Sequence, residues 1–201
     1  MNIKIGKTKF LISVPFCLLI SALLLLDKTG YMAFSLSAAA VHEFSHMIFM
    51  NIFHCPPQEI TASLKGVIIV GGRHASPKEE FFILLAGPLS NLCLAAAFHF
   101  AGQALNRGAA ISAAVVQSAV GIFNLLPISG LDGGSLLLII LETLVSPEKA
   151  KLSAKLTSIA FSSAVLFFGI SLLFKTRTNP TLLLLGIYLF FLNIPRLGCA
   201  G

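Results

Sequence analysis

HEFSH, residues 42–46, lies inside the apolar run YMAFSLSAAAVHEFSHMIFM, which extends from Tyr31 to Met50. On a helix, His42 and His46 are one turn apart on the same face, where two imidazoles can share one Zn²⁺, and the adjacent Glu43 can act on water. Ionisable side chains at membrane depth are costly and are functional candidates by default. Short patterns of this kind also recur by chance, so the motif alone predicts a metal site without establishing it.

The composition of the chain excludes a soluble domain with a polar surface. Of its 201 residues, 56% are hydrophobic and 11% charged, with a mean hydropathy of +0.91. The expected unit of such a chain is a span of about 20 apolar residues. We therefore predict an all-α polytopic membrane protein with about six transmembrane helices, roughly Phe10–Leu26, Tyr31–Phe53, Phe81–Ala101, Ala109–Leu126, Leu152–Phe174 and Pro180–Ile194. A further apolar run, Leu131–Val145, follows the fourth span.

The basic residues predict an orientation for these spans. If the N-terminus is cytoplasmic, ten of the 14 Lys and Arg residues fall in inner connections and four in outer ones. This is the bias typical of cytoplasmic loops. We therefore expect a multi-pass membrane protein with both termini in the cytoplasm and with His42 and His46 toward the cytoplasmic side.

A second motif begins at the end of the fourth span, NLLPISGLDGG at residues 124–134. The chain has two aspartates, and only Asp132 is placed within an apolar region, because Asp27 lies in a short loop. A catalytic zinc site needs three protein ligands and one open position, so Asp132 is the predicted third ligand. In the alternative interpretation, Asp132 caps the helix that begins after the break. The same residue can be both a zinc ligand and a helix cap.

A third motif, AGPLSN at residues 86–91, lies inside the third span. Its small residues and Pro88 predict a kink with close helix contact. Asn91 needs a further explanation, since an amide in hydrocarbon must find a partner. A site that handles peptide bonds would offer one.

HEFSH, AGPLSN and NLLPISGLDGG, in this order on successive spans, resemble the motifs of the site-2 protease family, the intramembrane zinc metalloproteases of peptidase family M50. The resemblance covers about Tyr31 to Val145. It implies that His42, His46 and Asp132 bind one zinc ion per chain and that Glu43 is the general base. It also implies that Asn91 and Asn124 bind the substrate backbone.

The implied reaction is cleavage of a membrane-tethered protein within or near its transmembrane segment, in regulated intramembrane proteolysis, with a sigma or anti-sigma factor as a candidate substrate. The stretch at residues 65–80 is too short for a PDZ domain, and no CBS domain is expected after the last span. This layout is most similar to the compact bacterial branch of the spore-formation proteases. We expect one transmembrane domain over residues 1–201, with a catalytic core at 31–145 and C-terminal helices at 152–194.

The expected partners are the substrate and the lipid bilayer, with room for a regulatory membrane partner and no nucleic acid. Two rival interpretations remain open, a metal transporter or zinc-binding scaffold and a catalytically silent relative. Transporters usually repeat their intramembrane ligands in both halves, whereas residues 152–201 contain no His and no acidic residue. Glu43 argues against the silent relative.

The connection between the second and third spans, from Glu59 to Gly72, is rich in β-branched residues and glycine. This composition predicts a short membrane-associated β-hairpin. A strand with an unpaired edge could hold an unwound substrate by β-augmentation. The hairpin could equally be a simple link between two spans.

Overall fold

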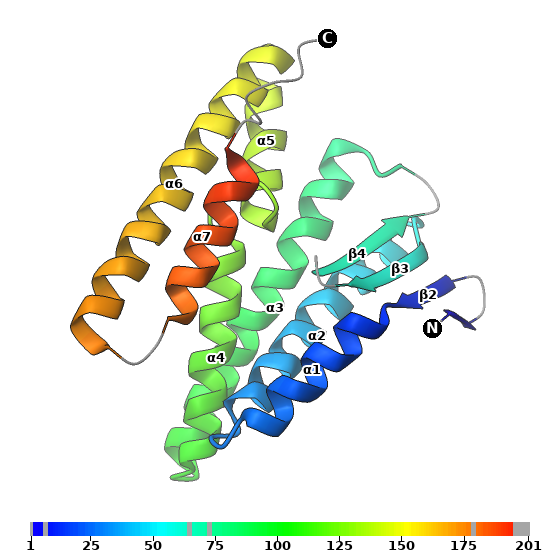
Figure 1. Cartoon of the computed structure of the whole chain (residues 1–201). Helices are drawn as coiled ribbons and strands as arrows, with labels where there is room; N and C mark the ends of the chain where they lie inside the picture. Colours follow the sequence, from blue (N-terminus) through cyan, green and yellow to red (C-terminus); the bar gives the residue numbers. More distant parts are fainter. Residues whose placement is uncertain (1, 6–7, 64–65, 72–73, 178–179, 195–201) are drawn as a thin grey trace. The chain divides into compact units, whose positions relative to one another are not determined.

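The computed structural model describes residues 2–5, 8–63, 66–71, 74–177 and 180–194. Within these residues the chain is mostly helical, with seven helices and one small four-stranded sheet (Figure 1). It divides into two compact units, Met1–Phe123 and Asn124–Gly201. The predicted helical architecture is confirmed.

The first unit contains four helices, α1 Val14–Leu26, α2 Tyr31–Ile52, α3 Pro77–Ala104 and α4 Gly108–Asn124. Helix α2 packs mainly against α3, and its buried residues recur every four positions, at Ala38, His42, His46 and Met50. Residues four apart lie on one face of a helix. The two histidines are therefore part of the stripe that α2 buries.

Local signals in the sequence set the start of α3. Ser76 and Glu79 form a capping box, in which the Glu79 carboxylate accepts a hydrogen bond from the Ser76 N–H at 2.7 Å. The Ser76 hydroxyl accepts in turn from the Glu79 N–H at 3.4 Å. Such a box satisfies backbone donors that a helix start leaves without an intrahelical partner. Helix α3 therefore begins at Pro77, shortly before the predicted third span begins at Phe81.

Asp27 organises the turn between α1 and α2. Its carboxylate accepts hydrogen bonds from the Thr29 hydroxyl at 2.6 Å and from the Met32 N–H at 2.7 Å. The Thr29 hydroxyl, followed by the backbone N–H groups, lowers the pKa of Asp27 below its ordinary value, because these bonds favour the charged form. Asp27 therefore has a structural role at the start of the helix that carries His42.

The predicted hairpin is present as β3 Pro57–Ser63 and β4 Gly66–Gly71, which pair in antiparallel fashion. Residues 64–65 and 72 of that prediction lie outside the described residues, as do Lys7, Lys65, Arg73 and Arg196 of the predicted inner connections. Two N-terminal strands, β1 Asn2–Ile5 and β2 Thr8–Ile12, extend the sheet to the order β1-β2-β3-β4. Strand β2 pairs in parallel with β3, so β4 presents an unpaired edge among the described strands.

These N-terminal strands change the first predicted span. Residues 10–12 were expected to begin a helix, but they belong to β2, and α1 begins at Val14. Phe10, Leu11 and Ile12 pair with β3, and the aromatic Phe10 and the β-branched Ile12 are residue types that favour strands. The Ser13 hydroxyl then accepts a hydrogen bond from the Phe16 N–H and starts the helix.

The second unit contains α5 Asp132–Leu144, α6 Pro147–Thr176 and α7 Thr181–Asn193. Helices α6 and α7 approach closely through two glycines. A Cβ at Gly169 would lie 2.8 Å from the Leu183 Cα, and one at Gly186 would lie 2.7 Å from the Leu166 Cα. Small residues that let backbones approach are typical of helix contacts in membranes.

Two helices of the described chain are long and apolar enough to cross a membrane, α3 and α6. Helices α1, α4 and α7 are apolar but have only 13, 17 and 13 residues. A bilayer core requires about 20 residues of helix. The count of six spans therefore remains a prediction.

Candidate metal centre

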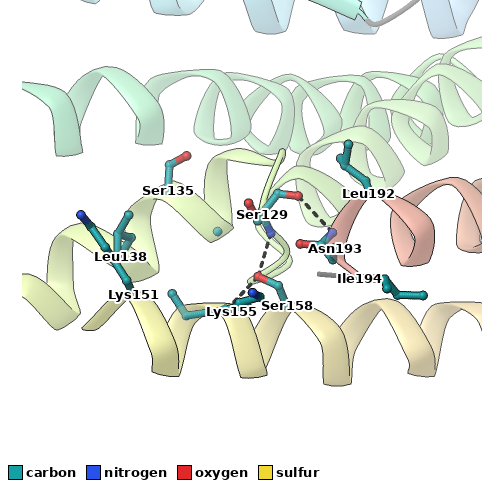
Figure 2. Close-up of a pocket in the computed structure, with 11 residues that line it drawn as sticks. Ser129, Ser135, Leu138, Lys151, Lys155, Ser158, Leu192, Asn193 and Ile194 are labelled. Atoms are coloured by element: carbon teal, nitrogen blue, oxygen red, sulfur yellow. Dashed lines mark hydrogen bonds between the residues drawn. The ribbon is translucent and has the colours of Figure 1, made fainter. Parts of the chain in front are cut away.

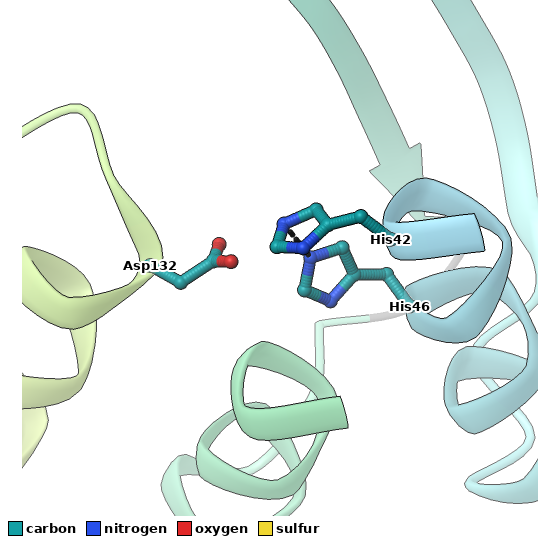
Figure 3. Close-up of side chains that lie close together, drawn as sticks. All are labelled: His42, His46 and Asp132. Carbon is teal, nitrogen blue, oxygen red and sulfur yellow. Dashed lines mark hydrogen bonds between the residues drawn. The ribbon is translucent and has the colours of Figure 1, made fainter. Parts of the chain in front are cut away.

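The two histidines of the HEFSH motif form a buried pair on α2. His42 is 5% exposed and His46 is 8% exposed. The Nε2 atom of one ring lies 3.2 Å from the Nε2 atom of the other. Figure 3 draws both rings together with Asp132, the third predicted ligand, which belongs to α5.

The opposite nitrogen of each ring faces an oxygen of α3. His42 Nδ1 lies 2.9 Å from the Asn91 side-chain oxygen Oδ1, and His46 Nδ1 lies 2.7 Å from the Ile83 carbonyl oxygen. A carbonyl oxygen can only accept a hydrogen bond, so His46 Nδ1 is the donor, and the Asn91 oxygen assigns the same role to His42 Nδ1. In the neutral rings, Nε2 is then the nitrogen that carries the lone pair.

This arrangement fits a zinc ion. Two nitrogen ligands at the usual Zn–N length of about 2.05 Å stand about 3.3 Å apart in a tetrahedral site, close to the 3.2 Å between the Nε2 atoms of His42 and His46. Hydrogen bonds from the second ring nitrogen to an oxygen are the usual support of zinc-binding imidazoles. Two unprotonated ring nitrogens this close repel each other, and a bound cation removes that repulsion.

Gly87 of the AGPLSN motif makes room for the pair. A Cβ at this position would stand 2.5 Å from His46 Nε2 and 2.8 Å from His42 Cε1. Every other amino acid would therefore collide with the two imidazole rings. The small residue predicted at this helix contact therefore accommodates the two imidazole rings.

Asn91 is fully buried, with 0% exposure, and its amide is engaged on three sides. Its oxygen faces His42, while its NH₂ group donates to the Ala38 carbonyl at 3.0 Å and to the Gln117 side-chain oxygen Oε1. Substrate binding by Asn91 was expected and remains untested. The observed partners of this amide are all groups of the protein on α2 and α4.

In the second unit, Asp132 is the first residue of α5 and is half-buried. The N-cap position is held by Leu131, without a capping bond from its side chain. The preceding residues fold back against the helix start, so that a Cβ at Gly133 would collide with the Leu125 carbonyl and one at Gly134 with the Ile128 carbonyl. The two glycines are therefore required by the turn that presents Asp132.

The remaining predicted site residues, Glu43 and Asn124, lie on α2 and α4. Glu43 follows His42 on α2 and is half-buried, and Asn124 is the last residue of α4, also half-buried. Both side chains are polar and partly exposed. Their predicted roles, general base and substrate contact, remain predictions.

The second unit also contains a cavity of about 410 Å³ (Figure 2). Ser129 on its wall donates its N–H to the Ser158 hydroxyl at 2.9 Å, and the Asn193 amide donates to the Ser129 carbonyl at 3.4 Å. Lys151 and Lys155 line the same cavity from α6. These bonds tie the loop before α5 to α6 and α7.

Sequence analysis did not identify the roles of two residues that lie around the histidine pair. One is Gly87, whose role was given as helix contact in general. The other is Gln117 on α4, 4% exposed and bonded to Asn91. A lone amide in the middle of an apolar helix was the available signal, since such a group must find a polar partner.

The fold and the site together define a class, a helical chain with the site-2 protease fold and a buried His-x-x-x-His pair. Site-2 Protease from Methanocaldococcus jannaschii has a similar structure, with a TM-score of 0.68 and 17% sequence identity over 100% of this chain and 99% of that one. No family model matches the chain.

A protein of Mycobacterium tuberculosis named "Putative zinc metalloprotease Rip3" is 34% identical over 110 residues, in two strains. The match covers 50% of this chain and 28% of Rip3. The resemblance to the site-2 protease family, expected from three motifs, is thereby confirmed.

Proposed function

We propose that the chain is an intramembrane zinc metalloprotease. The observation that carries the proposal is the buried histidine pair, with Nε2 atoms 3.2 Å apart and each Nδ1 bonded to an oxygen. The ligand group of the proposal consists of His42, His46 and Asp132. The relationship to a site-2 protease fold and to a zinc metalloprotease supports the same conclusion.

Each residue has a chemical role in this proposal. Zinc held by the two imidazoles and the Asp132 carboxylate supplies a Lewis acid and lowers the pKa of bound water. Glu43 accepts the proton of the attacking water and passes it to the leaving amine. Asn124 donates from its amide to the backbone of the opened substrate and holds it for attack.

The proposed substrate is a protein whose transmembrane segment is cleaved within or near the bilayer. A transmembrane helix encloses its peptide bonds in intrahelical hydrogen bonds, so it must unwind locally before attack. Strand β4 has an unpaired edge among the described strands, and its residues Val67, Ile68 and Val70 are 37%, 50% and 50% exposed. We propose that the unwound segment pairs with this edge.

The proposed location is a bacterial membrane, with both termini in the cytoplasm. An impermeant thiol reagent applied to intact cells tests this orientation after removal of the native cysteines. A cysteine at Arg107 is expected to react, and one at Lys151 is expected to be protected. The reverse pattern would invert the proposed orientation.

The proposed reaction is tested by co-expression with candidate single-span substrates. Glu43→Gln removes the base and keeps the shape of the side chain. We expect this variant to lose cleavage while it retains about one zinc ion per chain, since Glu43 is not a ligand. Proteolysis by purified Glu43→Gln protein would contradict the role of Glu43, and a parent that cleaves none of the substrates under conditions of full zinc loading would contradict the proposed activity.

A further inference from the structure

We propose that Gln117 and Asn91 form a relay of hydrogen bonds that fixes the tautomer of His42 and thereby sets the zinc affinity of the site. Both are positioning residues, acting through His42. The inference rests on the proposed function, because it assumes that His42 Nε2 is a zinc ligand.

The relay begins with the orientation of the Asn91 amide. The two ends of an amide differ chemically, since the NH₂ group donates and the oxygen accepts. The Ala38 carbonyl, 3.0 Å from Asn91 Nδ2, can only accept. Gln117 Oε1 is a second acceptor beside the same nitrogen. Two acceptors therefore hold the NH₂ end away from His42 and turn the Asn91 oxygen toward it.

The oriented oxygen then determines the protonation of the ring. Asn91 Oδ1, 2.9 Å from His42 Nδ1, accepts a hydrogen bond and places the imidazole proton on that nitrogen. Nε2 is left as the basic nitrogen, and it is the one 3.2 Å from His46 Nε2. If the amide were reversed, its NH₂ group would face His42 Nδ1 and favour the other tautomer, in which Nε2 carries the proton and cannot bind a metal.

Because the relay is buried, each of its hydrogen bonds is needed. Asn91 is 0% exposed, Gln117 4% and His42 5%, so water is not at hand to replace a lost partner. An unpaired polar group in such surroundings is costly. The relay also spans three helices, α4, α3 and α2. His46 has no such dependence, because a backbone carbonyl at Ile83 holds its ring.

The test is the zinc dissociation constant of the purified chain, measured by competition with a chelator, together with the visible spectrum of the Co²⁺-loaded protein. Asn91→Leu removes the acceptor at similar volume and should weaken zinc binding by about 10- to 100-fold, the usual effect of losing a ligand's hydrogen-bond partner. Gln117→Leu should weaken binding several-fold, whereas Gln117→Glu, which still accepts, should not.

The matched control is Ser90→Ala. Ser90 neighbours Asn91 on α3, but its hydroxyl bonds to the Gly87 carbonyl of the same helix at 2.7 Å and has no part in the relay. Zinc affinity and the Co²⁺ spectrum should be unchanged in this variant. A general loss of affinity on any polar-to-apolar change in α3 would appear here as well.

The double variant Asn91→Leu/Gln117→Leu separates a relay from two independent structural effects. Since Gln117 acts only through Asn91, the double variant should lose no more affinity than Asn91→Leu alone. Additive losses, or parental zinc affinity in Asn91→Leu, would overturn the relay alone. A parent that binds no zinc would overturn the proposed function and the relay with it.

Discussion

Helices approach closely in both units of the molecule, but the space that glycine opens is used differently. Between α2 and α3, the place of a Gly87 Cβ is taken by the His42 and His46 rings. Between α6 and α7, the places of the Gly169 and Gly186 Cβ atoms are taken by the backbone of the opposite helix. The same residue type thus admits two imidazole rings in one contact and a tight backbone approach in the other.

The polar residues follow the same division. The buried polar side chains of the α2–α3 contact, His42, His46 and Asn91, bond to one another and to groups of other helices. On α6, the buried Ser162 hydroxyl bonds to the Ile159 carbonyl of its own helix, and the Ser158 hydroxyl bonds to the Ala154 carbonyl while accepting from the Ser129 N–H of the loop before α5. The polar groups of the α2–α3 contact therefore join the two histidine rings to α3, whereas those of the second unit stay within one helix or hold the loop before α5.

The largest effect that this comparison predicts is that of Gly87→Ala. The added methyl group would lie 2.5 Å from His46 Nε2, so the rings must move and zinc binding should fall on the order of 100-fold or more, at least as much as for loss of a supporting hydrogen bond. Gly186→Ala is the matched change in the other contact. Overpacking there should lower the free energy of unfolding by about 1–3 kcal/mol with zinc affinity unchanged.

Chelator competition and thermal unfolding of the two purified variants check this pair of expectations. If Gly87→Ala binds zinc like the parent, the glycine serves helix contact only. If Gly186→Ala loses zinc without a change in unfolding, the assignment of α6 and α7 to packing is wrong.

A smaller effect is predicted for the sheet, which carries no predicted metal ligand. Proline at Ile68 removes one backbone donor from β4. We expect Ile68→Pro to lower cleavage of a membrane substrate several-fold, with unchanged zinc content and expression. Ile68→Ala, which keeps the N–H, should cleave at a rate close to the parent's. Parental cleavage by Ile68→Pro, or loss of zinc along with activity, would contradict a role of the β4 edge in substrate capture.

The sequence predicted the helices well where apolar length and caps agree. Helix α2 begins at Tyr31 as expected and ends one residue before the predicted Phe53. The run 131–145 is a helix, Asp132–Leu144, that begins at the predicted aspartate. The N-terminal strands were missed because β2 is stabilised by pairing with β3, about 50 residues away in sequence, and periodicity within the segment does not report such a partner.

The predicted site shows a similar limit. His42 and His46 were identified by a spacing that a helix converts directly into proximity. Gln117 was missed because its role depends on α4 and α3 meeting at Asn91, which no local pattern specifies. Asn91 was noticed for the right reason, an amide that must be satisfied, but its protein partners could only be seen in the packed helices.

The most direct test of the central claim is X-ray absorption at the zinc edge of the purified chain, loaded with one equivalent of zinc, for the parent, Asp132→Ala and Asp27→Ala. The account predicts imidazole nitrogen and oxygen ligands at about 2.0–2.2 Å and no sulfur ligand at about 2.3 Å in the parent and in Asp27→Ala. It predicts loss of bound zinc in Asp132→Ala. A sulfur ligand in the parent, or an unchanged zinc content and spectrum in Asp132→Ala, would contradict it.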